Sequence, residues 1–313
     1  MTEELNPLQL EIIDSLGVPA GWEPLPREIV AGVETMLADE LAPIDGLFTP
    51  EDPLRVTKHH LGTVHGCEKR FLAERSQKFA WSVPTVRGTV AHKAIELMIN
   101  WPGEPVPADL VEAAITSIIE NPRESASTFL ETLPDHDMAE LRGQVVQLVT
   151  NFGDCFPPIK PQWRPMVEYT AKYTLFSGAV IFTARMDLVL GLPGRRVIID
   201  LKSGWIGAQH RDDLRYYALI ETLRSRQAPR RLGTYSLERA RLDHEEVTEG
   251  VLQAAGRRTG QGARAMAELI SGTRDAEVRP GFHCRWCPLN KTCEEGVRHL
   301  RTLDGDEADG DDW

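Results

Sequence analysis

Three consecutive runs typical of β-strands, in the middle of the chain, constrain its fold more than any other feature. The runs cover residues 166–176, 179–190 and 195–202, and they are rich in β-branched and aromatic side chains. Short glycine-containing turns at residues 177–178 and 191–194 separate them. The pattern predicts three strands joined as an antiparallel meander.

Helical patterns surround these strands. Apolar side chains at helical spacing, with proline and glycine at the breaks, delimit the segments. The segment at residues 55–78 is expected to contain a helix that carries Cys67. The other expected elements are helices over residues 27–41, 84–101, 209–226 and 249–271, a mostly helical stretch over 108–156, and a strand over 231–237. This order predicts an α/β fold with a small mixed sheet flanked by helices.

Two aspartates and a lysine lie on the second and third expected strands. Asp187 is near the end of the second strand, and Asp200-Leu201-Lys202 ends the third after an apolar run. Strand alternation places Asp200 and Lys202 on one face, and a hairpin brings Asp187 beside them. Two close carboxylates repel each other unless a divalent cation such as Mg²⁺ or Mn²⁺ binds between them. A surface ion pair is the alternative interpretation of Asp-x-Lys by itself.

The helix before the strands adds a histidine. His92 and Glu96 are four residues apart, so they share one helical face, and Gly88 precedes His92 by one turn. A histidine in this position can complete a metal site. Gly88 lets another backbone approach the helix closely. An exposed or hydrogen-bonded helix histidine is the alternative.

The order of these residues resembles the motifs of RecB-type PD-(D/E)XK nucleases, which have a restriction-endonuclease-like core. The residues that carry the resemblance are Gly88, His92, Glu96, Asp187, Asp200 and Lys202. The implied ligands of Mg²⁺ or Mn²⁺ are His92, Asp187, Asp200 and the backbone carbonyl of Leu201. Lys202 is the implied catalytic lysine. The resemblance implies hydrolysis of DNA phosphodiester bonds, with single-stranded or free ends as the expected substrate.

The helix after the third strand departs from the family pattern at one position. Family members carry Gln-x3-Tyr there, and this chain has Tyr217 but Asp213 in place of the glutamine. Arg211 and Arg215, four residues apart on this helix, are candidate phosphate contacts, with a solvated face as the alternative. Trp205 directly follows the third strand and is a candidate for stacking on unpaired bases.

Five cysteines give a second group of candidate ligands. Cys284, Cys287 and Cys293 form a Cys-x2-Cys-x5-Cys run, which in a reducing compartment indicates a metal rather than a disulfide. Either Cys67 or Cys155 would supply a fourth thiolate. Four cysteines suit both a [4Fe–4S] cluster and Zn²⁺.

The cysteine pattern is similar to the iron–sulfur branch of the same family, which includes CRISPR-associated exonucleases and AddB subunits. One cysteine precedes the nuclease core in that branch and three follow it. The resemblance implies a [4Fe–4S] clasp on Cys67 and on residues 284–293, and it covers residues 55–295 of this chain. Residues 1–54 are then a helical extension, residues 103–160 a helical insertion, and residues 296–313 an acidic disordered tail.

Composition neither excludes nor requires a nucleic-acid ligand. The formal net charge is −12, but nine lysines and arginines gather between residues 195 and 231. No apolar run is long enough for a membrane span, and the N-terminus lacks the order of a signal peptide, so we expect a cytoplasmic protein. A helicase or a CRISPR-related protein is a possible partner. The alternatives to a nuclease are a catalytically silent DNA-binding subunit and a zinc-stapled interaction protein.

Overall fold

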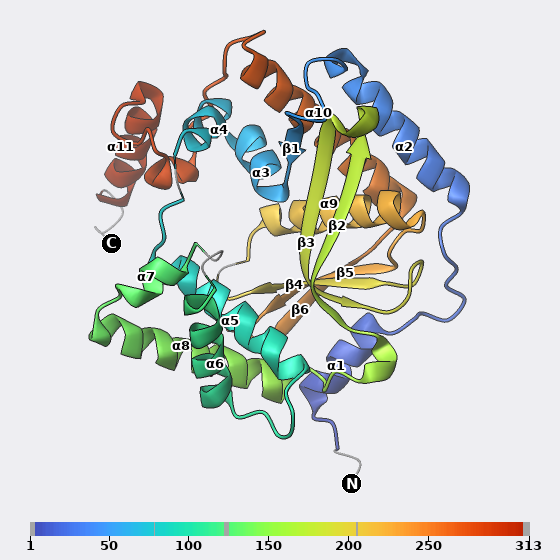
Figure 1. The fold of residues 1–313 in the computed structure, drawn as a ribbon, viewed down its shortest axis with the longest axis vertical. Helices are drawn as coiled ribbons and strands as arrows, with labels where there is room; N and C mark the ends of the chain where they lie inside the picture. The colour runs from blue at the N-terminus through green and yellow to red at the C-terminus, as the bar shows by residue number, and fades with distance from the viewer. Residues whose placement is uncertain (1–3, 78, 122–124, 205, 309–313) are drawn as a thin grey trace. The chain divides into compact units, whose positions relative to one another are not determined.

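The structure, a computed structural model, describes residues 4–77, 79–121, 125–204 and 206–308. Backbone contacts divide the chain into two units, each assembled from three separate segments. Unit 1 consists of Met1–Val30, Ala80–Ala171 and Arg185–Leu252, and unit 2 consists of Ala31–Phe79, Lys172–Ala184 and Gln253–Trp313. Each unit therefore combines segments that are far apart in the sequence, as the different colours within it show (Figure 1).

The predicted mixed sheet is confirmed, with six strands where the sequence predicted four. Its strands are β1 Leu54–Val56, β2 Met166–Leu175, β3 Val180–Leu190, β4 Val197–Lys202, β5 Arg231–Ser236 and β6 Arg241–Glu246. They follow the order β1-β3-β4-β5-β6, and β2 also pairs with β3. The β3–β4 and β5–β6 pairs are antiparallel, whereas β1–β3 and β4–β5 are parallel. Strands β2 and β3 both continue from one unit into the other.

Strand β4 lies between β3 and β5, with its apolar run covered on both faces. Val197, Ile198 and Ile199 are all buried, as expected for a strand enclosed by other layers. Helix α9, Ala208–Ser225, joins β4 to its parallel neighbour β5 and packs on both strands (Figure 1). This crossover fixes the end of β4, where Asp200 and Lys202 lie.

A group of helices contributes the remaining core of unit 1. The helices are α1 Pro7–Leu16, α5 Val83–Ile99, α6 Pro107–Ile119, α7 Ser127–Glu131 and α8 Asp135–Cys155. Helices α5, α6 and α8 pack on one another (Figure 1). Their apolar faces share one core cluster with the sheet, in which the rings of Phe152 and Tyr235 lie 5.8 Å apart. Helix α5 is therefore held against the sheet by buried apolar area.

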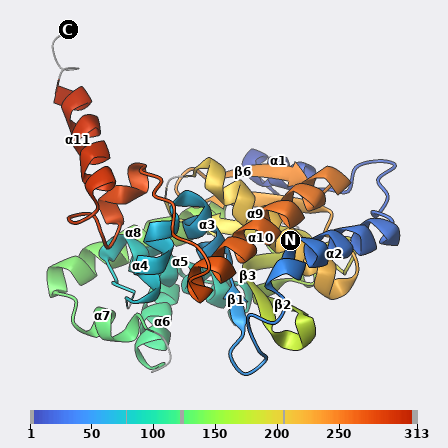
Figure 2. The ribbon, with the colours of Figure 1, turned by 90° about the horizontal axis from the view of Figure 1, so that it is seen from above.

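Unit 2 is mostly helical. Its α-helices are α2 Arg27–Leu41 and α10 Glu249–Ser271, which both begin in unit 1, together with α3 Lys58–Gly66, α4 Glu68–Arg75 and α11 Glu294–Ala308. Its 3-10 helices include η4 Phe282–Trp286. A Cβ atom on Gly260 of α10 would lie 2.5 Å from Cγ of Glu40 on α2, so glycine allows these helices to approach closely. Helix α11 follows η4 and packs against it (Figure 2).

Several expectations from the sequence need correction. Strands β1 and β6 and helix α1 were not predicted, and Cys67 lies between α3 and α4 instead of inside one helix. The disordered tail expected from residue 296 is wrong at its start, because α11 continues to Ala308. The last residues, 309–313, lie outside the described residues.

Candidate active site

Helix α5 carries His92 and is positioned by its own sequence. Ser82 is its N-cap, Pro84 lies in its first turn, and Oγ1 of Thr85 accepts a hydrogen bond from the Ser82 N–H at 2.9 Å. One turn before His92, a Cβ atom on Gly88 would lie 3.0 Å from Oγ of Ser203. Glycine therefore lets α5 approach the residues that follow β4.

Both ring nitrogens of His92 face hydrogen-bond acceptors. Nε2 lies 3.0 Å from the carbonyl oxygen of Leu201, and Nδ1 lies 3.4 Å from Oδ1 of Asp187. A carbonyl and a carboxylate can only accept, so both nitrogens must carry hydrogens to satisfy them. Burial lowers the pKa of His92, but the negative charges of Asp187 and Asp200 outweigh burial and raise it above 6.5.

The backbone of Leu201 connects the elements of the site. Its N–H donates to Oδ2 of Asp187 at 2.7 Å, while its carbonyl faces His92. Asp187 lies on β3 and is buried. These contacts hold β4 against β3 and α5 at the point where Asp200 and Lys202 project from the strand.

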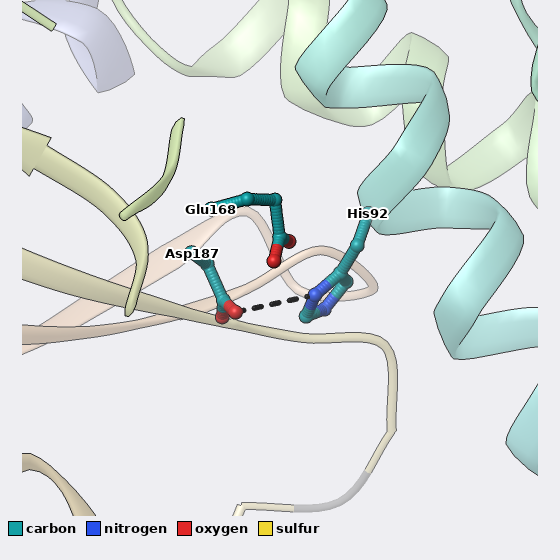
Figure 3. A group of neighbouring side chains, drawn as sticks. All are labelled: His92, Glu168 and Asp187. Atoms are coloured by element: carbon teal, nitrogen blue, oxygen red, sulfur yellow. Dashed lines mark ion pairs between the residues drawn. The ribbon is translucent and has the colours of Figure 1, made fainter. Parts of the chain in front are cut away.

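Glu168 on β2 completes a group of three possible metal ligands. One ligand atom from each of His92, Glu168 and Asp187 lies within 4.8 Å of the other two (Figure 3). Burial, followed by the charge of Asp187, raises the pKa of Glu168, and its ion pair with Arg185 opposes the shift. A divalent cation would relieve the repulsion between the two carboxylates.

Sequence reasoning missed Glu168. The available signal was an acidic residue inside the first β-rich run, next to Val167 and Tyr169. Its backbone has φ 51°, a left-handed conformation that residues other than glycine rarely adopt. Such strain is common at functional positions and costs on the order of 1–3 kcal/mol. Neither the conformation nor the approach of β2 to α5 is encoded in the hydrophobic pattern.

Asp200 and Lys202 form a pair at the end of β4. Nζ of Lys202 lies 2.6 Å from Oδ2 of Asp200, whose side chain is fully buried. In the parallel ladder with β5, Asp200 is opposite Thr234 and Lys202 is opposite Ser236. The lysine therefore neutralises a carboxylate that would be costly to bury as an isolated charge.

These residues lie in a part of the chain that matches a known protein family. The sequence model of the PD-(D/E)XK nuclease superfamily matches residues 55–294. The chain belongs to this superfamily. Membership implies a nuclease hydrolase that acts on DNA, and PD-(D/E)XK nucleases typically use Mg²⁺ or Mn²⁺. The match includes every residue of the site described above.

Two solved structures are similar to this PD-(D/E)XK protein. An exonuclease candidate from Eubacterium rectale has 11% sequence identity and a TM-score of 0.46, over 88% of this chain and 94% of its own. The protein SSO0001 has 10% identity and a TM-score of 0.34, over 85% of this chain and 97% of its own. A search of the curated proteins finds no match. Among the described residues, no helix is both long and apolar enough to cross a membrane.

The other predicted site residues have varied surroundings. Glu96 pairs with Lys93 at 3.0 Å and is not part of the three-residue ligand group. Arg215 pairs with Glu245 of β6, with Nε 2.8 Å from Oε2, while Arg211 is exposed. Tyr217 is buried.

Two further predicted positions follow β4 in the sequence. Trp205 lies outside the described residues. Asp213 is half-buried on α9, where the family pattern has glutamine.

Arg87, which sequence reasoning did not select, links α5 to the residues after β4. Its Nη2 donates to the carbonyl of Ser203 at 2.7 Å and lies 3.1 Å from Oε1 of Glu238. Arg87 lies between Val86 and Gly88 on the helix that carries His92. It therefore ties the histidine-bearing helix to the segment that follows Lys202.

Four cysteines of unit 2 line one small pocket. They are Cys67, Cys284, Cys287 and Cys293. Backbone N–H groups of Gly281 and Leu289 point at the sulfurs of Cys284 and Cys287, each at 3.4 Å. A Cβ atom on Gly296 would lie 3.4 Å from the Cys284 sulfur, so glycine leaves room beside the thiols. N–H donors directed at sulfur are typical of bound thiolates.

Glu68 holds the first cysteine segment against the segment that leads to the other three. Its buried carboxylate lies 2.6 and 2.9 Å from the guanidinium of Arg274 and 3.4 Å from that of Arg279. It also accepts from the N–H of Glu277 at 2.9 Å. The hydrogen bonds from Arg274 lower the pKa of Glu68 in spite of burial. Ion pairs therefore help to define the pocket.

Proposed function

We propose that this chain is a metal-dependent DNA nuclease of the RecB-like iron–sulfur branch. The observation that carries the proposal is the convergence of His92, Glu168 and Asp187 within 4.8 Å, next to the β4 segment that bears Asp200 and Lys202. Family membership supports the nuclease class. The resemblance of the motif order supports the branch.

The proposed Mg²⁺ or Mn²⁺ site uses His92, Glu168 and Asp187, with Asp200 and the Leu201 carbonyl as further ligands. The donor set fits a hard cation because it is mostly oxygen, and the two acids favour a nearby positive charge. A bound ion supplies Lewis acidity and a more acidic water. His92 must release a proton to become a ligand, since both its nitrogens face acceptors.

Lys202 is the proposed catalytic lysine. Its ammonium is a fixed positive charge at the end of β4, where it can stabilise negative charge that develops on a phosphate. Asp200 holds this ammonium at 2.6 Å, which limits its rotamers.

We further propose that the four cysteines bind a [4Fe–4S] cluster. All four cysteines line a single pocket, as the ligands of one cluster would. Lys69, Arg70 and Arg279 also line the pocket, and their charge suits an anionic thiolate cluster. The cluster would bind together Cys67 and the C-terminal run.

Single-stranded DNA with free ends is the proposed substrate, and exonucleolytic cleavage is the proposed mode. Both come from the resemblance to the iron–sulfur branch, in which related chains act beside helicases or in CRISPR-associated processing. Partnership with such a protein is part of the same proposal.

The test is cleavage of single-stranded DNA labelled at the 5′ or 3′ end, with and without Mn²⁺. We expect Mn²⁺-dependent shortening by the wild-type protein and loss of cleavage on Lys202→Ala, with retained DNA binding. Lys172→Ala, which removes an exposed lysine from β2, is the matched control. If neither wild type nor Lys202→Ala cuts and both bind equally, the catalytically silent subunit replaces this proposal. Zinc without iron in the purified protein would overturn the cluster assignment.

A further inference from the structure

The η4 turn of unit 2 exposes two aromatic rings and a guanidinium. Phe282 and Trp286 are 62% and 65% exposed, which is unusual for large apolar side chains. Their ring centroids lie 5.0 Å apart at 76°, and Cζ of Arg285 lies 5.4 Å from the Phe282 centroid. The three side chains form one patch, which we call the η4 platform.

The position of the η4 platform follows from the cysteine pocket. Cys284, in the middle of η4, is buried in that pocket, and Cys287 follows directly after the turn. Drawing these two thiols inward leaves Phe282 and Trp286 outward. Contact between the two rings buries part of their apolar surface, but most of that surface remains exposed to water. The two rings lie together and leave an aromatic surface that is accessible to a ligand.

The segment that contains the η4 platform has a positive net charge, whereas the whole chain has a negative one. Residues 281–293, from the start of η4 to the start of α11, contain Arg285 and Lys291 and no acidic residue, whereas the formal net charge of the chain is −12. Both basic side chains are exposed. Aromatic faces beside a local excess of positive charge match the chemistry of an unpaired nucleic-acid strand, which offers bases to stack and phosphates to neutralise.

We propose that Phe282, Arg285 and Trp286 form a stacking site for the unpaired bases of a DNA strand. The choice of a nucleic-acid ligand rests on the proposed nuclease function, but the site is distinct from the catalytic residues, all of which belong to unit 1. Stacking tolerates any base sequence, because every base presents a π-face. The η4 platform therefore holds the strand without selecting a sequence.

The test compares two probes, a labelled oligodeoxythymidine and an abasic oligonucleotide with the same number of phosphates. Binding is measured with the full-length protein in buffer without divalent metal, so that no cleavage is needed. We expect Phe282→Ala and Trp286→Ala each to weaken oligodeoxythymidine binding about tenfold. The abasic probe binds wild type and both variants equally. Trp286→Phe restores most of the affinity, because a ring is retained.

The controls separate stacking from loss of structure. Leu192→Ala removes a side chain that is 54% exposed in unit 1, and it leaves the binding of both probes unchanged. Melting temperature, iron content and visible absorbance of the platform variants match the wild type. Equal weakening of both probes, or no weakening of either, overturns the proposal and assigns the exposed rings to a protein partner. A chain that shows the expected binding but never cuts DNA overturns the proposed nuclease function alone.

Discussion

The acidic site of unit 1 and the cysteine pocket of unit 2 differ in chemistry and in how the chain assembles them. The first gathers His92, Glu168 and Asp187 from a helix and two strands, with mostly oxygen donors. The second takes three thiols from one short run and a fourth from a residue more than two hundred positions earlier. Hard cations such as Mg²⁺ prefer the oxygen donors of the acidic site, whereas iron and zinc prefer the thiols of the cysteine pocket.

The comparison shows that two kinds of preorganisation coexist in one chain. Buried strands and backbone hydrogen bonds, such as that from the Leu201 N–H to Asp187, position the acidic site. Turns and ion pairs, such as those of Glu68 with Arg274, position the cysteine pocket. We therefore expect the acidic site to govern catalysis and the cysteine pocket to govern stability, and the following predictions test that separation.

The largest effect is expected for Asp187→Asn. This change removes the charge beside His92 and one of the three carboxylates proposed to bind the cation, so cleavage should fall by at least roughly 10³-fold. The measurement is the single-turnover cleavage rate at saturating Mn²⁺, together with iron content. Asp243→Asn, which removes an exposed carboxylate on β6, should leave the rate unchanged. A loss of iron in Asp187→Asn would contradict the separation of the two regions.

The second prediction concerns Cys67→Ser. Loss of this ligand should remove the iron and the constraint between Cys67 and the C-terminal run. The free energy of unfolding should then fall by about 5 kcal/mol, if the loop-entropy estimate for cross-links applies to a cluster. Denaturant unfolding and iron analysis check this outcome. Cys155→Ser, at the end of α8 in unit 1, should retain iron. An unchanged free energy of unfolding after iron loss would mean that ion pairs alone hold the pocket.

The third prediction tests whether Glu168 is a ligand of the proposed cation. Glu168→Gln keeps the size of the side chain but removes its charge, so Mn²⁺ affinity should fall roughly 10- to 100-fold. Isothermal titration of the intact protein measures this affinity. Glu96→Gln, on the helix that carries His92, is the control, because Glu96 pairs with Lys93. Equal affinities of wild type and Glu168→Gln would remove Glu168 from the ligand set.

The smallest effect is expected for Glu74 in unit 2. Burial would raise the pKa of Glu74, but hydrogen bonds from His59 and Arg70 outweigh burial and lower it from 4.5 to about 2. The carboxylate therefore stabilises the fold above pH 4.5, and this contribution is lost as pH falls toward 2. Glu74→Gln should lower the free energy of unfolding by about 1 kcal/mol at neutral pH, after allowance for solvent screening.

The pH dependence checks the sign of that prediction. Denaturant unfolding of wild type and Glu74→Gln at several pH values should show a difference that narrows below pH 4.5. Glu112→Gln removes a more exposed carboxylate, which pairs with Arg142 at 2.6 Å on the surface of unit 1. The free energy of unfolding of Glu112→Gln should differ little from that of the wild type at any pH. A difference that widens in acid would contradict the assigned direction.

The sequence predicted those parts of the fold that depend on apolar periodicity. Helices α2 and α10 have the expected bounds, and β4 follows directly from its run of valine and isoleucine. Strand β6 was missed because Arg241–Glu246 is almost entirely polar, as is common for a strand at a sheet edge. Helix α1 did have a signal, since Asn6 and Gln9 form a capping box and Pro7 opens the helix.

The candidate site was predictable in composition but not in full geometry. His92, Asp187, Asp200 and Lys202 could be selected because their order resembles a family motif. Glu168 could not, since its place depends on a left-handed backbone conformation in β2 and on tertiary contact with α5 and β3. The ion pair between Arg215 and Glu245 could not be predicted either, because Glu245 lies on β6 and that strand was not expected.

The interleaving of the two units has a consequence for synthesis on the ribosome. The acidic-site residues, from His92 to Lys202, all emerge before Cys284 is translated. Cys67 emerges earlier still and must wait for nearly the whole chain before its thiol partners exist. If the cysteines bind metal as proposed, its delivery is a late step in maturation. A nascent or truncated chain that ends before residue 284 contains the residues of the acidic site but lacks three of the four cysteines.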